Sequence, residues 1–242
     1  MINLSNAIYF ENPWPHIIIE NFIRDKAAVD VLTHNKSLVN YLRDASDGFR
    51  NTVREELNYQ QLLDCNDFPS EVIDVISACD QSKELKDLLE FHLLPKLLET
   101  YNKPEEYFKT FEKYEFSYGG YSPIQDDILG ERLKDTHIDG PKKIYTGMIY
   151  FKHPDDHDEH SNFVLESYDE NGVQTQTKVL PYSNNIAIFW PNLPNAWHHA
   201  QARGKNNIVR RHINFVANGL DDLHDYSKSG FRIYGWKKVH KL

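Results

Sequence analysis

The chain has 242 residues, of which 40% are hydrophobic and 26% charged, a balance typical of one globular domain with a sizeable core. The formal net charge of -9 argues against general affinity for nucleic-acid phosphate or an anionic membrane. Two cysteines, Cys65 and Cys79, are too few for a disulfide framework or a thiolate zinc site. The sequence shows no signal-peptide pattern and no apolar run near the ~20 residues of a membrane helix. We therefore expect a cytoplasmic protein with one domain over residues 1–242.

Residues 24–110 are predicted to be mainly helical. Ser70 is the predicted N-cap of one helix, because an acidic residue and an apolar run follow it. Leucines recur at helical spacing over residues 85–98, where Pro95 is expected to kink or split the helix. Pro104, followed by two glutamates, indicates another helix start.

Residues 111–218 alternate between apolar and polar side chains, as strands with one buried face do. Turn signals such as Asp169-Glu170-Asn171-Gly172 separate these strands, without helices between them. Ile17-Ile18-Ile19 indicates an earlier strand. The order favours a mainly β fold, an antiparallel sandwich or barrel flanked by N-terminal helices. The predicted strands of this part are Tyr114–Tyr118, Ile144–Phe151, Phe163–Tyr168, Ile186–Trp190 and Ile208–Val216.

Two short sequences supply candidate metal ligands. In Thr136-His137-Ile138-Asp139, the side chains of His137 and Asp139 share one side if the segment is extended. The second sequence is Trp197-His198-His199-Ala200, in which only one of the two histidines can face the same metal. Two imidazoles and one carboxylate on one face of an octahedral ion leave three positions open. That arrangement suits Fe(II) with a bidentate co-substrate and O2.

An arginine pair lies downstream of the second histidine. Arg210 opens a predicted strand, and its guanidinium can hold a carboxylate through two parallel hydrogen bonds. The alternative is Arg211, which shares a strand face with Ile213 and Phe215.

Three stretches together resemble the 2-oxoglutarate- and iron(II)-dependent dioxygenases, nearest to their prolyl-hydroxylase-like branch. They are Asn12-Pro13-Trp14-Pro15-His16-Ile17-Ile18-Ile19-Glu20-Asn21-Phe22, then His137-Ile138-Asp139 with Lys143 and Tyr145 to Phe151, then Pro194-Asn195-Ala196-Trp197-His198-His199-Ala200 with Arg210. The resemblance spans most of the chain. It implies a double-stranded β-helix, or jelly roll, as the core over about residues 111–218, with helices packed outside.

The resemblance also implies roles for single residues. His137, Asp139 and His198 would bind Fe(II), with His199 as the alternative to His198. Arg210 would pair with the distal carboxylate of 2-oxoglutarate, the co-substrate used with O2. Tyr150 matches a position that often contacts the same carboxylate, and strand parity brings Thr146 and Met148 to the same pocket. The family often has Ser or Ala where this chain has His212, and alternation places His212 inward with Arg210 as a further 2-oxoglutarate contact.

The implied activity is hydroxylation of a C–H bond in a small-molecule or peptidyl substrate, with release of succinate and CO2. The alternative is a cupin-like sugar epimerase or a non-catalytic binding module on the same barrel, which would need no arginine aimed at a dicarboxylate. The acidic, histidine-containing stretch 153–160 is interpreted as a solvated loop, with a second metal site or a lid as alternatives. Residues 219–242 are interpreted as a C-terminal tail. The sequence indicates neither the substrate nor the oligomeric state.

Overall fold

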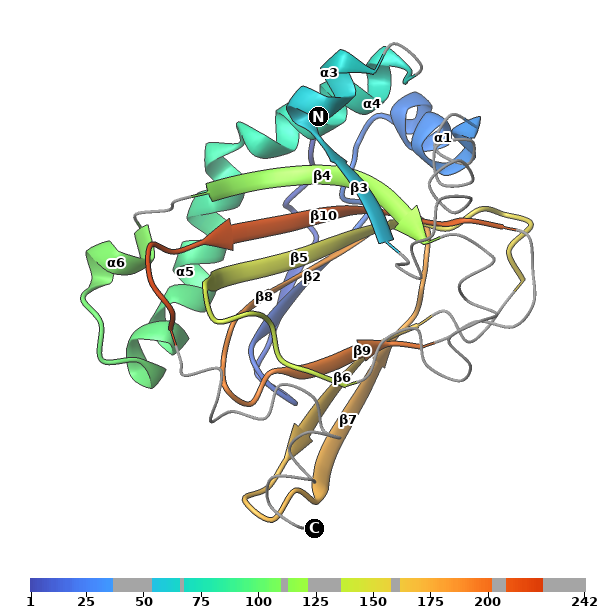
Figure 1. Cartoon of the computed structure of the whole chain (residues 1–242). Coiled ribbons are helices and arrows are strands. Elements are labelled where there is room, and N and C mark those ends of the chain that lie inside the picture. The colour runs from blue at the N-terminus through green and yellow to red at the C-terminus, as the bar shows by residue number, and fades with distance from the viewer. Residues whose placement is uncertain are drawn as a thin grey trace, which may run out of the picture.

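The structure is a computed structural model, and it describes residues 1–36, 54–65, 68–109, 113–121, 136–157, 162–201 and 208–223. Two antiparallel β-sheets form its frame, and helices cover the outer side of the larger sheet (Figure 1). Part of the 153–160 loop and most of the 219–242 tail lie outside the described residues.

The larger sheet has seven strands in the order β1-β2-β8-β5-β10-β4-β3. The smaller sheet has the order β7-β6-β9. Each pair of neighbouring strands is antiparallel, as in a jelly roll. The strands are β1 (Ala7–Phe10), β2 (His16–Glu20), β3 (Arg54–Asn58), β4 (Lys113–Tyr121), β5 (Lys143–Phe151), β6 (Phe163–Tyr168), β7 (Gln174–Leu180), β8 (Ile186–Pro191), β9 (Trp197–Ala200) and β10 (Arg210–Asn218).

The main apolar core lies between the larger sheet and the helices. Phe215 of β10 packs against Phe116 of β4 and Phe189 of β8, at ring-centroid distances of 4.8 and 5.7 Å. Gly147 of β5 leaves room for this packing, because a Cβ there would lie 2.3 Å from the Phe189 ring. The helices are α1 (Lys26–His34), α3 (Tyr59–Asp64), α4 (Ser70–Asp80), α5 (Lys83–Thr100) and α6 (Glu105–Lys109).

The predicted fold class, mainly β with a jelly-roll core and flanking N-terminal helices, is confirmed. Each of the five strands predicted after residue 110 is present, as is the early strand at Ile17-Ile18-Ile19. Gly172 closes the predicted turn after β6 with φ 76°, and its amide donates to the carbonyl of Asp169. The sequence did not predict β1, β3 or β7 as strands, and it treated β9 as extended only as a condition for choosing between His198 and His199.

In the helical half, the predicted N-cap was wrong, and of the two effects predicted for Pro95 the split of the helix does not occur. Ser70 is the first residue of α4, and Pro69 occupies the N-cap position without a side-chain hydrogen bond. Pro95 does not split its helix, since α5 is continuous from Lys83 to Thr100. Proline removes the hydrogen bond to the carbonyl four residues earlier, here that of Phe91. Phe91 is 76% exposed and Pro95 is exposed, so water can satisfy that carbonyl.

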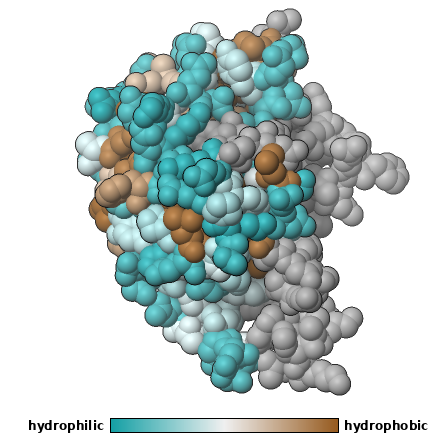
Figure 2. Space-filling model, turned by 90° about the vertical axis from the view of Figure 1, so that its left-hand side faces the viewer, coloured by the Kyte–Doolittle hydropathy of each residue, from teal (hydrophilic) through white to brown (hydrophobic). Residues whose placement is uncertain are grey.

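The outer face around α5 and α6 is mainly hydrophilic, with separate apolar spots (Figure 2). Of the helices that the structure describes, none combines the length and the apolar character needed to cross a bilayer.

Candidate metal centre

Three buried side chains converge where the two sheets face each other. His137 and Asp139 lie on an irregular segment before β5, and His198 lies on β9. One ligand atom from each residue lies within 4.8 Å of the other two. Among the described residues, this is the one group of three or more histidine, cysteine or acidic side chains close enough to share a metal ion.

The backbone holds the two histidines opposite each other. His137 and His198 form an isolated antiparallel bridge, in which the amide of each residue donates to the carbonyl of the other at 3.0 and 2.8 Å. Their rings lie 4.4 Å apart between centroids. The bridge therefore places the segment that carries His137 and Asp139 beside the free edge of the smaller sheet.

The orientation of His198 leaves one ring nitrogen for a metal. Its Nδ1–H donates to the carbonyl of Ala196 at 2.9 Å, so Nε2 carries the lone pair of the ring. Nε2 lies 3.7 Å from Oδ2 of Asp139. A backbone carbonyl on the second nitrogen is the usual companion of a metal-binding histidine. Trp190 and Phe163 flank the ring at 5.1 and 5.4 Å.

Asp139 is ionised in this site although it is buried. Burial alone would raise the pKa of its carboxyl group, but Lys143, His198 and His137 hold that pKa well below its usual value. Lys143 donates to Oδ1 at 2.7 Å, and the indole N–H of Trp190 donates to Oδ2 at 3.0 Å. The site thus offers a charged oxygen ligand beside two imidazoles.

His199 points to the other face of the smaller sheet. Its Nδ1 lies 3.1 Å from the Thr136 hydroxyl and 3.5 Å from Oε2 of Glu166. Burial acts to raise the pKa of the Glu166 carboxyl, but hydrogen bonds from His199, Tyr168 and Thr136 lower it overall. Of the two adjacent histidines, the structure therefore brings His198 to the triad and directs His199 into a separate buried polar cluster.

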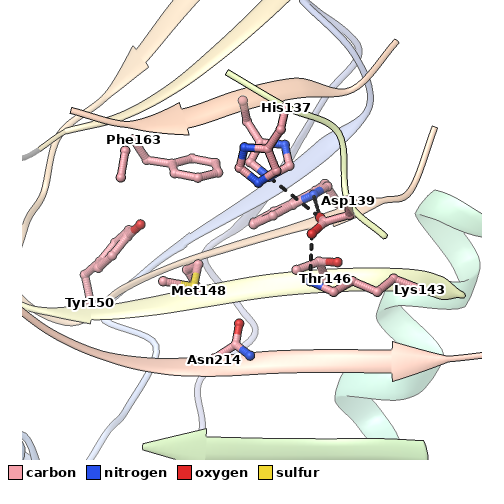
Figure 3. A pocket seen from close by; sticks show the side chains of 11 residues that line it. His137, Asp139, Lys143, Thr146, Met148, Tyr150, Phe163 and Asn214 are labelled. Atoms are coloured by element: carbon pink, nitrogen blue, oxygen red, sulfur yellow. Dashed lines mark hydrogen bonds and ion pairs between the residues drawn. The ribbon is translucent and has the colours of Figure 1, made fainter. Parts of the chain in front are cut away.

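A pocket opens from the triad into the space between the sheets (Figure 3). Thr146, Met148 and Tyr150, which the sequence placed in the pocket, line it from β5. Asn214 lines it from β10, where it pairs with Met148 in the register. Its remaining lining residues are Lys143, Phe163, Trp190 and Ala200.

Sequence reasoning did not place Asn214, Trp190 or Phe163 in the pocket. Asn214 shares the parity of Arg210 and His212, so the alternation that placed those two inward also predicts Asn214. Trp190 pairs with Thr146 across β8 and β5, whereas Phe163 pairs with Ala200 across β6 and β9. Those pairs depend on strand order, which the sequence does not reveal. Lys143 was recognised as part of the motif but not as a partner of Asp139.

Arg210 and His212 lie at the Tyr150 end of the pocket, outside its lining. His212 is opposite Tyr150 in the register, and both Arg210 and His212 are buried. The guanidinium of Arg210 lies 5.8 Å from the ring of Tyr182, which contacts Tyr150 at 5.3 Å. Its Nη2 donates to the carbonyl of Gln201 at 2.7 Å. Neither residue lines the pocket of Figure 3, so Tyr182 connects Arg210 to it.

Arg211 has a different environment. Its guanidinium donates to the carbonyls of Val209 and Asn35, at 3.1 and 3.5 Å. Asn35 directly follows α1, so Arg211 lies on the helix-covered face of the larger sheet. The structure thus separates the two arginines onto opposite faces of β10, as alternation predicts.

The described part of the 153–160 loop is tied to α1. Nε2 of His153 lies 2.9 Å from Nδ1 of His34, and Asp155 lies near the other ring nitrogen of His153. This contact does not form a second group of three metal ligands among the described residues. Residues 158–160, which include His160, lie outside the described residues.

No protein-family model matches the sequence, and no curated protein matches it. Solved structures match its fold. A prolyl 4-hydroxylase structure from Phytophthora capsici has a TM-score of 0.51 at 12% identity, over 85% of this chain and 59% of that chain. A protein described as an oxygenase, from Shewanella oneidensis, has a TM-score of 0.52 at 10% identity, over 94% of this chain and 90% of that chain. The chain therefore shares the prolyl-hydroxylase-like fold and holds a buried His-Asp-His triad inside it.

Proposed function

We propose that the chain is an Fe(II)- and 2-oxoglutarate-dependent dioxygenase that hydroxylates a C–H bond of a small-molecule or peptidyl substrate. The reaction converts the C–H group, O2 and 2-oxoglutarate into an alcohol, succinate and CO2. The observation that carries the proposal is the buried triad of His137, Asp139 and His198, which opens into a pocket between the two sheets.

The residues present fit ferrous iron. Two neutral imidazoles and one carboxylate are the donor set of the facial triad found in non-haem iron oxygenases. Asp139 is ionised, and Nε2 of His198 lies 3.7 Å from its Oδ2. When bound, the ion supplies the redox chemistry with O2 that amino-acid side chains lack.

The protein would contribute binding, orientation and the exclusion of water. Arg210 is the proposed partner of the C5 carboxylate of 2-oxoglutarate, supported by its burial and by its contact with Tyr182 at the Tyr150 end of the pocket. The hydroxyl of Tyr150 would donate to the same carboxylate, with His212 beside it. Thr146 and Met148 would shape the space between this end and the triad.

The test is turnover. Protein purified without metal is supplied with Fe(II), 2-oxoglutarate and O2, and succinate is measured with and without pools of peptides or metabolites. We expect succinate to form only when all three are present, and to be lost in the Asp139→Ala variant. A sugar epimerase or a binding module on this barrel would form no succinate under any of these conditions.

A further inference from the structure

Both oxygens of the Asp139 carboxylate have hydrogen-bond donors from the protein. The ammonium group of Lys143 donates to Oδ1 at 2.7 Å, and the indole N–H of Trp190 donates to Oδ2 at 3.0 Å. Oδ2 is also the oxygen 3.7 Å from Nε2 of His198. The two oxygens are therefore distinct, since Oδ2 faces the histidine ligand and Oδ1 is paired with a cation (Figure 3).

The two donors belong to neighbouring strands of the larger sheet. Lys143 is the first residue of β5, and Trp190 lies on β8, which pairs with β5 through Thr146 and Trp190. Trp190 is 2% exposed and packs against Phe163 at 5.1 Å. Asp139, by contrast, lies outside the strands, on a segment joined to β9 by the His137 bridge. The frame of β5 and β8 thus carries both donors to a carboxylate that lies outside the strands.

A carboxylate can bind a metal through one oxygen or through both. Binding through both would occupy one of the three positions that the triad leaves open, and the proposed reaction needs all three for the oxo acid and O2. An ammonium group on Oδ1 opposes a second metal bond at that oxygen, because the two cations compete for the same lone pairs and repel each other.

We propose that Lys143 and Trp190 are positioning residues that present Asp139 to the metal through Oδ2 alone and keep the other coordination positions open. This inference rests on the proposed function, because it requires ferrous iron at the triad and 2-oxoglutarate as a ligand of the open positions. Neither residue needs to touch 2-oxoglutarate or the substrate to act in this way.

The experiment loads the wild-type protein and four variants with Fe(II) in the absence of O2. Lys143→Met removes the cation, Lys143→Arg keeps it, and Trp190→Phe keeps an aromatic ring without the N–H group. Lys142→Met is the matched control, because Lys142 is the adjacent cation and does not line the pocket. The readouts are Fe(II) affinity, the X-ray absorption spectrum at the iron edge, and 2-oxoglutarate affinity.

We expect Lys143→Met to shift the spectrum from a one-oxygen to a two-oxygen carboxylate. Its 2-oxoglutarate affinity should fall about tenfold or more, by the scale on which activity falls when an outer-shell partner of a metal ligand is lost. Its Fe(II) affinity should hold or rise, because a positive charge beside the ion is gone. Lys143→Arg and Lys142→Met should behave as wild type. Trp190→Phe should weaken Fe(II) binding about tenfold or more, the scale of one hydrogen bond to a charged group.

Three outcomes would overturn the inference. One is a one-oxygen spectrum with unchanged 2-oxoglutarate affinity in Lys143→Met. Another is a parallel loss of Fe(II) and 2-oxoglutarate binding in that variant, which would mark a merely structural role. The third is unchanged Fe(II) affinity in Trp190→Phe. Failure of the wild-type protein to bind Fe(II), or to bind 2-oxoglutarate once Fe(II) is bound, is a separate result, which would contradict the proposed function itself.

Discussion

His137 and His198 face each other across a backbone bridge in which each amide donates to the other residue's carbonyl, at 3.0 and 2.8 Å. The residues on the other side of this bridge, Thr136 and His199, are joined through the carboxylate of Glu166. The His137–His198 bridge therefore directs these two histidines into the barrel interior. It directs Thr136 and His199 to the opposite face, where they meet Glu166. The spacing of the proposed ligands depends on this pairing.

Replacing any of the three proposed ligands with alanine should remove most Fe(II) binding. His137→Ala, Asp139→Ala and His198→Ala each leave two ligands, and an open site with two ligands holds ferrous iron weakly. The measurement is Fe(II) affinity in the absence of O2, together with succinate formation. Retention of wild-type affinity in any of the three would remove that residue from the triad.

His199→Ala should keep Fe(II) binding and lose stability instead. The carboxylate of Glu166 is buried and loses a partner in this variant, which typically costs about 1–3 kcal/mol. Denaturant unfolding of the metal-free protein measures this cost, and Fe(II) titration measures the binding. Equal loss of Fe(II) affinity in His198→Ala and His199→Ala would contradict the assignment of His198.

Arg210→Ala should raise the 2-oxoglutarate concentration needed for activity by roughly thirtyfold or more, since removing one partner of a buried charge pair costs about 2–5 kcal/mol. Fe(II) affinity should change little. Arg211→Ala is the matched control, because Arg211 binds backbone carbonyls on the helix-covered face and should affect stability rather than 2-oxoglutarate. A large shift in Arg211→Ala alone would contradict the assignment of Arg210, because it would place the co-substrate on the helix-covered face of β10.

Tyr150→Phe should act in the same direction as Arg210→Ala but less strongly. The variant keeps the ring, which contacts Tyr182, and removes one neutral hydroxyl worth about 1 kcal/mol, or roughly fivefold in affinity. Succinate formation against 2-oxoglutarate concentration measures the shift. A loss as large as that of Arg210→Ala would indicate that the hydroxyl has a further role.

The sequence predicts which side chains share one face of a strand, but it does not predict the order of the strands in the sheet. Alternation along an extended chain is enough to place His137 with Asp139 and to separate Arg210 from Arg211. It does not show which strands are neighbours, so Trp190 could not be placed beside Asp139. That contact depends on β8 lying next to β5, although 34 residues, 152–185, separate β5 from β8 in the chain.

The strands β1, β3 and β7, which the sequence did not predict, all lie at sheet edges. In β7, most side chains are exposed, so polar residues replace the alternating apolar pattern. β1 and β3 are the two edges of the larger sheet, where a strand needs only one partner and a weaker apolar signal. Ser70 was predicted to be the N-cap because a serine before an acidic residue resembles one. In the structure Ser70 is already the first residue of the helix.

The free energy of unfolding should fall as the pH drops from about 6.5 toward 4. Burial lowers the pKa of His16 to about 4. The nearby Lys178 lowers this pKa further, whereas the hydrogen bond from His16 Nδ1–H to the Trp14 carbonyl acts to raise it. In this window the unfolded chain binds a proton that the folded chain does not, so stability rises with pH and is fully present above pH 6.5.

The loss attributable to His16 is about 2 kcal/mol between pH 7 and pH 5. Denaturant unfolding at the two pH values measures it, with His16→Gln as the control because glutamine does not titrate. A loss of the same size in both proteins would assign the pH dependence to other groups.

The most direct test of the central assignment is a titration with Fe(II) and 2-oxoglutarate in the absence of O2, followed by visible absorption. Chelation of ferrous iron by the 2-oxo acid gives a weak charge-transfer band that neither component gives alone. We predict that the wild-type protein forms this band, that Asp139→Ala does not, and that Arg210→Ala forms it only at much higher 2-oxoglutarate concentration. Fe(II) binding without any band at saturating 2-oxoglutarate would contradict the account.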